Sequence, residues 1–345
     1  MNYYVYIQGI LGLKTNLNSF NWVYGSVAPK VDKSEYENCK IKIILDVRKS
    51  GSVFENSFNK KDYDKYNYFY GYKNKNKIYY ERNFIFNSKL RYSIEVDKNE
   101  IKIIMSKSYV NYIKYKFMNL HSVGYIMSDL ISGILLMNGY STLHCSAVNF
   151  KKKSLAIFGP PGTGKTITAI NLCREKKINF IAEDIAVTDG ENIFSVPWTS
   201  TFRYYNHEKE SLKDKVVNLL RKNIPLFQLV SIKKKKTIDE YLGKGCFVNE
   251  SKLTDIVILA KGDNKILKGK EGILENIINL NKYEFNYHRS PSMLVMNYFN
   301  PDLSIDKMFE KEKEILKKVV KNSNVYKIFE HDSFSYSDHI EDNLL

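Results

Sequence analysis

Residues 159 to 166 read Gly-Pro-Pro-Gly-Thr-Gly-Lys-Thr and match the phosphate-loop pattern Gly-x-x-x-x-Gly-Lys-Ser/Thr. Two inner glycines allow the backbone to turn with its N–H groups pointing inward. The lysine ammonium can contact the β and γ phosphates, and the last hydroxyl can bind Mg²⁺. We therefore expect ATP, or another nucleoside triphosphate, to bind with Mg²⁺ at Gly159, Pro160, Pro161, Gly162, Thr163, Gly164, Lys165 and Thr166, with Thr166 on the metal.

The sequence around this loop supplies the elements that the motif requires. An apolar run over 155–158 predicts a strand before the loop, and 165–176 predicts a helix after it. A helix that begins at the loop presents free N–H groups and its positive end to an anion. The alternative is a glycine-rich turn that binds nothing, and the flanking strand and helix argue against it.

Two carboxylates follow the next predicted strand. The apolar run at 178–182 ends at Glu183 and Asp184. Phosphoryl transfer needs a carboxylate to accept the proton of the acceptor hydroxyl, and a second carboxylate commonly holds the metal. We expect Asp184 on the metal side and Glu183 as the base, and the reverse assignment stays open. For either residue, the alternative is a structural cap of a turn or helix.

The order of these features resembles a known superfamily. A predicted strand at 143–148 carries His144 and precedes the loop, the helix and the acidic pair. AAA-type ATPases share the loop sequence, but their acidic strand lies farther along the chain. The arrangement here resembles the HPr kinase/phosphorylase superfamily, which is distantly related to phosphoenolpyruvate carboxykinase. It is most similar to the divergent branch found beside peptide-maturation genes, which includes lasso-peptide tail kinases.

The resemblance covers roughly residues 117–330 and is strongest over 143–197, where it includes Ser195-Val196-Pro197-Trp198. It implies a kinase and a phosphate contact for His144, although a core histidine is the alternative. Arg203 could neutralise the transferring charge or lie on the surface. Glu183 stands where the family usually has aspartate, and the second signature of true HPr enzymes is missing. The missing signature disfavours HPr as the substrate and the reverse phosphorylase reaction. The glutamate in place of aspartate keeps open a nucleotide-binding protein without kinase activity.

The elements that must position these residues form an α/β pattern. Residues 1–115 read as a smaller β-rich domain, with β-prone runs at 3–8 and 41–47, a hairpin over 91–105 and a loop over 60–77. This domain is a candidate for substrate recruitment. Residues 116–345 read as an HPr-kinase-like phosphate-loop domain, with a mixed sheet flanked by helices. Its predicted helices lie near 117–138, 272–280 and 308–320, its late strands at 255–260 and 325–329, and a loose tail follows Glu330.

Composition limits the partners and the compartment. The net charge is +15, from 53 basic and 38 acidic residues. Because lysine, asparagine, isoleucine and tyrosine are abundant throughout, we do not expect a nucleic-acid partner. The four cysteines show no paired spacing, and no signal peptide or membrane-spanning run is present, so we expect a cytoplasmic protein. A homo-oligomer stays open.

These inferences favour one function and leave two alternatives. The first is a kinase that moves the γ-phosphate of ATP to a Ser or Thr hydroxyl of a peptide or small protein, such as the precursor of a ribosomal peptide natural product. The second is a kinase for a small molecule. The third is a nucleotide-binding switch that hydrolyses ATP without a phosphate acceptor. For a kinase, the catalytic candidates are His144, Lys165, Glu183 and Asp184. A switch would keep the loop and lose the chemistry of the acceptor.

Overall fold

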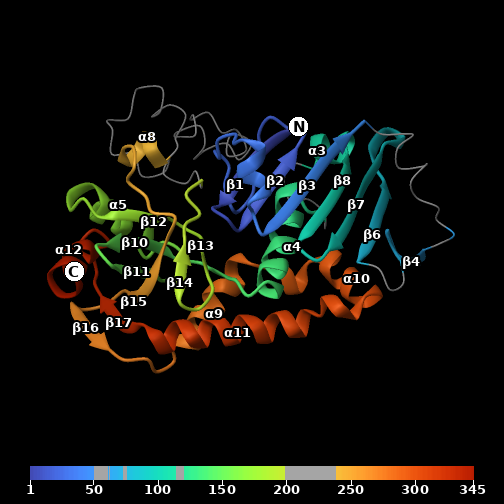
Figure 1. Ribbon diagram of the computed structural model, residues 1–345. Coiled ribbons are helices and arrows are strands. Elements are labelled where there is room, and N and C mark those ends of the chain that lie inside the picture. Colours follow the sequence, from blue (N-terminus) through green and yellow to red (C-terminus); the bar gives the residue numbers. More distant parts are fainter. Residues whose placement is uncertain (50–60, 62, 73–75, 114–119, 199–237) are drawn as a thin grey trace.

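The computed structural model describes residues 1–49, 61, 63–72, 76–113, 120–198 and 238–345, and it contains two mixed β-sheets flanked by helices (Figure 1). In this part of the chain the first sheet has eight strands in the order β1-β2-β3-β8-β7-β6-β5-β4. Its strands are β1 (Asn2–Ile7), β2 (Leu11–Thr15), β3 (Ile41–Arg48), β4 (Asp64–Tyr66), β5 (Phe69–Gly71), β6 (Lys77–Asn83), β7 (Lys89–Asp97) and β8 (Glu100–Ser106).

Alternating side chains explain how the first sheet forms. The expected hairpin is confirmed, because β7 and β8 pair antiparallel with Val96 opposite Ile101. Ile94, Ile101 and Ile103 are buried, while Glu95 and Lys102 on the other face are exposed. This period-two pattern is typical of strands with one face on a core. Two short helices accompany the sheet, α1 (Lys33–Glu37) and α3 (Lys107–Tyr112).

The loop expected over 60–77 is only partly correct. Within the described part of this segment, β4 and β5 form, and β6 begins at Lys77. Tyrosines and a phenylalanine explain the difference, because Phe69 is buried and its ring lies 5.0 Å from that of Tyr80 in β6. Contacts between aromatic rings on neighbouring strands stabilise the sheet here, although lysine and asparagine are frequent in this segment and disfavour strands.

Gly71 in β5 leads to a stability prediction. A Cβ added at this glycine would collide with the Phe299 ring of helix α10 (Pro291–Phe299). We expect Gly71→Ala to destabilise the protein by about 1–3 kcal/mol, the usual effect of overpacking a core. Thermal unfolding checks this. The double variant Gly71→Ala/Phe299→Leu should recover part of the loss, and an unchanged midpoint in the single variant would contradict the packing seen here.

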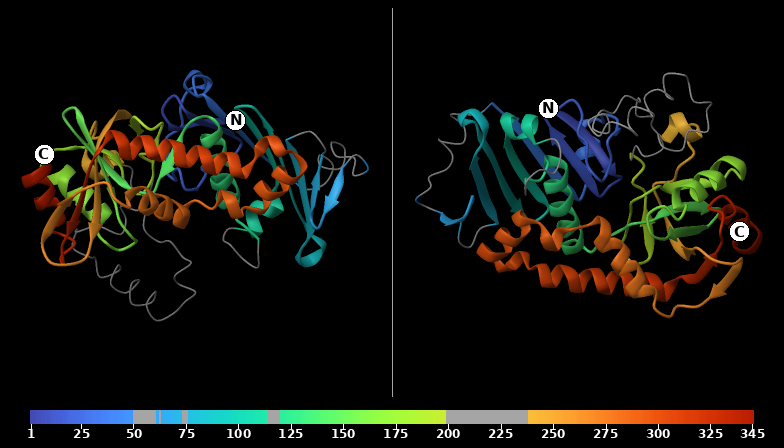
Figure 2. Two further views of the ribbon diagram at one scale, coloured as in Figure 1. Left: turned by 90° about the horizontal axis from the view of Figure 1, so that it is seen from below. Right: turned by 180° about the vertical axis from the view of Figure 1, so that it is seen from behind.

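Helices that follow the first sheet in the chain share a core with it. The helices are α4 (Val123–Met137), α10 and α11 (Ile305–Asn322), and their buried Leu130, Met293 and Met308 belong to one apolar cluster with Ile43 and Ile94 of the sheet. Figure 2 shows α11 running from its start near α10 to the second sheet, where β17 follows it. The domain boundary near residue 115 and the recruiting role of residues 1–115 stay predictions.

The second sheet contains the predicted phosphate loop. Its strand order among the described residues is β12-β10-β11-β15-β14-β13-β9, with β17 paired to β15 and β16 to β17. The strands are β9 (Ser141–Leu143), β10 (Ser146–Phe150), β11 (Lys153–Phe158), β12 (Asn179–Ala182), β13 (Ala186–Thr188), β14 (Asn192–Phe194), β15 (Glu250–Ala260), β16 (Lys265–Lys268) and β17 (Asn324–Phe329). The remaining α-helices are α5 (Lys165–Glu175), α8 (Ile238–Leu242), α9 (Ile273–Glu284) and α12 (Tyr336–Leu344).

Strand direction brings several chain segments to one edge of this sheet. β11, β15 and β17 are parallel, and β10 runs antiparallel to both β11 and β12. The C-terminal ends of β11, β12, β15 and β17 therefore meet at the edge where β10 begins. Ligands of open α/β sheets bind at the C-terminal ends of parallel strands.

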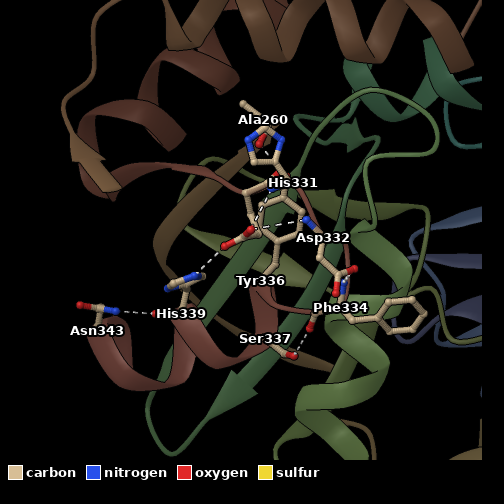
Figure 3. A network of polar contacts seen from close by, with 9 residues as sticks. Ala260, His331, Asp332, Phe334, Tyr336, Ser337, His339 and Asn343 are labelled. Atoms are coloured by element: carbon tan, nitrogen blue, oxygen red, sulfur yellow. Dashed lines mark hydrogen bonds and ion pairs between the residues drawn. The ribbon is translucent and has the colours of Figure 1, made fainter. Parts of the chain in front are cut away.

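The expectation of a loose tail beyond Glu330 is wrong. Helix α12 forms, the Tyr336 side chain is buried, and its hydroxyl donates to the carbonyl of Ala260 at 2.6 Å. His339 contacts the Glu330 carboxylate at 2.9 Å, in the network shown in Figure 3. Polar residues suggested a loose end, but the tail packs its few apolar side chains beside α5 and β15.

Candidate phosphate-binding site

The loop at 159–166 has the backbone that an anion site requires. It begins directly after β11 and leads into α5, as the sequence predicts. Gly162 and Gly164 have φ of +80° and +112°, which other residues rarely adopt. Gly164 is the N-cap of α5 and no side chain caps this helix. The first N–H groups of α5, which lack intrahelical acceptors, are available to phosphate oxygens.

Lys165 lies inside the site rather than in solvent. Its side chain is buried, and its ammonium donates to the Gly159 carbonyl at 2.7 Å. Burial lowers the pKa of Lys165, and the nearby Asp184 carboxylate opposes that effect. The Asp184 carboxylate therefore favours the charged form of Lys165, and the resulting ammonium can attract a phosphate oxygen. Thr166, the next residue, is buried in the first turn of α5.

His144 is held beside this lysine by a break in the expected strand. Residues 143–148 were expected to form one strand, but the chain leaves β9 at Leu143 and enters β10 at Ser146. Asn281 of α9 stabilises the break, because its Oδ1 accepts from the His144 N–H at 2.9 Å and its Nδ2 donates to the Thr142 carbonyl at 2.8 Å. The contact involves residues far apart in the chain, so local sequence could not predict it.

The imidazole of His144 lies between the lysine and an acidic residue. Its Nε2 lies 3.4 Å from the Lys165 ammonium, and its Nδ1 lies 3.8 Å from the Asp184 carboxylate. Burial lowers the pKa of His144, so a neutral ring that accepts from Lys165 fits the geometry. Its buried Nδ1 has no hydrogen-bond partner among the described residues. Such an unpaired group is suited to a ligand that the structure does not contain.

The two predicted acidic residues lie in different surroundings. The turn after β12 is fixed by the Ser146 hydroxyl, which donates to the Glu183 carbonyl. Glu183 is 1% exposed, whereas the Asp184 side chain is 35% exposed. The two adjacent carboxylates therefore differ in their exposure to solvent. Their separate catalytic roles stay predictions.

Helix α9 adds two residues that the sequence analysis missed. Glu284, its last residue, lies within electrostatic reach of Asp184 and Lys165. Burial, together with the Asp184 charge, raises the pKa of Glu284 to about 7. Tyr283 places its ring 6.1 Å from the imidazole of His144. Neither residue belongs to a local motif, and only the packing of α9 against β9 and α11 could reveal them.

The residues present fit Mg²⁺ bound together with a nucleotide. Within the described residues, no group of three or more His, Cys, Asp or Glu side chains could hold a metal ion alone. Mg²⁺ commonly takes one or two protein oxygens, with phosphates and waters filling its other positions. The Thr166 hydroxyl and the Asp184 carboxylate are oxygen ligands of this kind. The buried Nδ1 of His144, 3.8 Å from the Asp184 carboxylate, has no hydrogen-bond partner among the described residues.

Comparisons with known proteins do not settle the family. No family model matches the chain, and no curated protein matches it. A solved structure of the HPr(Ser) kinase/phosphatase from Coxiella burnetii is matched with 11% identity and a TM-score of 0.24, over 37% of this chain and 77% of that one. An identity and a TM-score this low support no conclusion about the family or the function of this chain. The α/β fold with two mixed sheets is shown, and the superfamily resemblance stays an interpretation of the motifs.

Two further expectations concern other parts of the chain. Arg203, suggested as a neutralising group, lies outside the described residues. In the described part of the chain, none of the helices has the length and apolar character needed to cross a membrane. The cytoplasmic location and a homo-oligomer stay predictions.

Proposed function

We propose that this protein is an ATP- and Mg²⁺-dependent kinase that transfers the γ-phosphate to a Ser or Thr hydroxyl of a peptide or small protein. One observation carries the proposal. Lys165 of the phosphate loop, His144 and Asp184 lie together at the sheet edge where β11 and β12 end, with 3.4 Å between the lysine and histidine nitrogens and 3.8 Å between histidine and aspartate. A simple anion-binding loop does not require an imidazole and a carboxylate beside its lysine.

The proposed reaction forms a bond between the acceptor oxygen and the γ-phosphorus while the bond to the bridging oxygen of ADP breaks. The hydroxyl proton passes to a carboxylate, and ADP leaves with the electron pair of the broken bond. Lys165 would neutralise the phosphate charge, and His144 would donate from its unpaired Nδ1. Mg²⁺, when bound, neutralises the charge that develops on the phosphate oxygens. Thr166 and Asp184 would hold this ion.

A peptide acceptor is the favoured substrate, and labelled ATP can test it. The purified protein is incubated with Mg²⁺, ATP labelled in its γ-phosphate, a Ser/Thr peptide library and a metabolite extract. Label on peptide is the expected result. Label on a metabolite would point instead to a small-molecule kinase, and release of free phosphate alone would point to a nucleotide-hydrolysing switch. The second and third results each reject a peptide kinase.

Glu284 gives a prediction about the proton acceptor. A carboxylate with a pKa near 7 is matched to general-base work at neutral pH, so Glu284 is a candidate beside the acidic pair. If it accepts the proton, Glu284→Gln should lower phosphoryl transfer by on the order of 10²- to 10⁴-fold. MgATP should bind at least as tightly as in the wild type, because the substitution removes a negative charge from an anion site.

Initial-rate kinetics and calorimetric ATP titration check this prediction. Glu275→Gln on the exposed face of the same helix is the matched control. Transfer near the wild-type rate in Glu284→Gln would exclude this residue as the base and leave the role to the acidic pair.

A further inference from the structure

A pocket of about 650 Å³ opens beside the phosphate loop. This volume lies within the range of ligand-binding pockets, roughly 300–1,000 Å³. The loop, the end of β15 and one face of α9 line it. The lining residues include Pro160, Pro161, Leu280 and Tyr283, with Lys261 and Lys327 as the charged groups. The catalytic proposal does not use this pocket.

The position of the pocket indicates which part of a bound ATP it would face. The lysine of a phosphate loop reaches the β and γ phosphates. Tyr283 lines the pocket and also lies beside His144, which in turn lies beside Lys165. Pro160, Pro161 and Thr163 of the phosphate loop also line the pocket. The pocket therefore borders the phosphate loop on one side and, through Tyr283, the surroundings of His144 on the other.

The lining gives the chemistry of the occupant. Ile258, Leu259 and Leu280 offer an apolar surface, and 64% of the Tyr283 side chain is exposed. The two lysines are the charged lining groups, and no Asp or Glu lines the pocket in the described residues. Lys261 is fixed in place, because its ammonium donates to the His331 carbonyl and the Ser333 hydroxyl, each at 2.8 Å. An apolar group that carries a nearby negative charge complements this surface.

Two asparagines add a feature that suits a peptide. Asn276 and Asn279 lie one turn apart on the exposed face of α9 and both line the pocket. Side-chain amides both donate and accept hydrogen bonds, as the backbone of an extended peptide does. An apolar surface, amides at helical spacing and fixed positive charge together favour a peptide segment.

We propose that this pocket binds the residues beside the phosphate-accepting Ser or Thr, with a large apolar side chain inside it and an acidic side chain facing Lys261 or Lys327. The proposal rests on the proposed kinase function and adds the sequence preference of its substrate. Burial of one large apolar side chain contributes about 1.5–3 kcal/mol, which corresponds to roughly 10- to 100-fold in affinity.

Asn279→Trp tests the proposal by filling the pocket. Asn279 is exposed, so the larger side chain does not disturb the core. The matched control is Asn322→Trp, the same change at the exposed end of α11, outside the pocket. The probe is a synthetic peptide in which a phenylalanine and two aspartates flank a single serine. Two further peptides replace the phenylalanine by alanine or the aspartates by lysines.

Binding is measured by fluorescence anisotropy, transfer by label from ATP, and nucleotide affinity by calorimetry. We expect the wild type and Asn322→Trp to prefer the first peptide by roughly 10- to 100-fold, and Asn279→Trp to lose that preference while it still binds MgATP. Weaker MgATP binding in Asn279→Trp would assign the pocket to the nucleotide and overturn the proposal.

Two other outcomes separate this inference from the proposed function. Equal use of all three peptides by the wild type and by Asn279→Trp would overturn the pocket assignment and leave the kinase intact. A wild-type protein that binds MgATP and phosphorylates no peptide would reject the peptide kinase and, with it, this inference.

Discussion

Lys165→Met is expected to lower phosphoryl transfer by at least about 10²-fold, the usual effect of removing one group that stabilises transition-state charge. It should also weaken ATP binding, because the ammonium at the loop is lost. The fold should survive. Burial already disfavours the charged form of Lys165, and methionine keeps most of the apolar stem. Calorimetric titration, initial rates and thermal unfolding measure the three effects.

Lys152→Ala is the matched control for this variant. It removes a positive charge from the exposed turn between β10 and β11, away from the loop. The control should retain wild-type binding and transfer. If Lys165→Met retains both as well, residues 159–166 do not form the phosphate site.

Asp184→Asn and Glu183→Gln are expected to have the second largest effect. Each removes one negative charge at nearly constant shape, and each should lower transfer by on the order of 10²- to 10⁴-fold. The variant that loses the metal ligand should need more Mg²⁺ to reach its maximal rate. Because the Asp184 carboxylate is the more exposed of the two and lies 3.8 Å from the Nδ1 of His144, we expect this shift in Asp184→Asn.

Magnesium titrations of both variants check this assignment. Asp97→Asn, in the exposed hairpin between β7 and β8, controls for the loss of a surface carboxylate. Thermal unfolding of Glu183→Gln separates a chemical effect from the cost of altering a buried residue. Near wild-type transfer in both variants would show that the acidic pair takes no part in the reaction.

The strand, loop and helix around Lys165 could be predicted because each depends on neighbouring residues. An apolar run, glycines at the turn and a helical pattern all lie within 153–175, and the structure places β11 and α5 there. The hairpin of β7 and β8 depends on similarly local signals. In these segments the secondary structure that the local sequence favours is also the one that packs in the fold. The sequence alone therefore predicted these elements.

The rest of the site depends on contacts between distant parts of the chain. Asn281 fixes the break that holds His144, although 137 positions separate the two residues. Glu284 and Tyr283 reach the site only because α9 packs against β9 and α11. No local pattern distinguishes them from other residues of an amphipathic helix. The packing of the tail could not be predicted for the same reason. Burial of Tyr336 and its hydrogen bond to Ala260 hold the tail in place, although most of its residues are polar.

The most direct test is a crystal structure of the protein with Mg²⁺ and a non-hydrolysable ATP analogue. The account predicts that the triphosphate lies along residues 159–166, with its γ-phosphate facing Lys165, His144 and Asp184 and with Mg²⁺ on Thr166 and Asp184. A triphosphate bound elsewhere, or a γ-phosphate that points away from Asp184 and His144, would contradict the account.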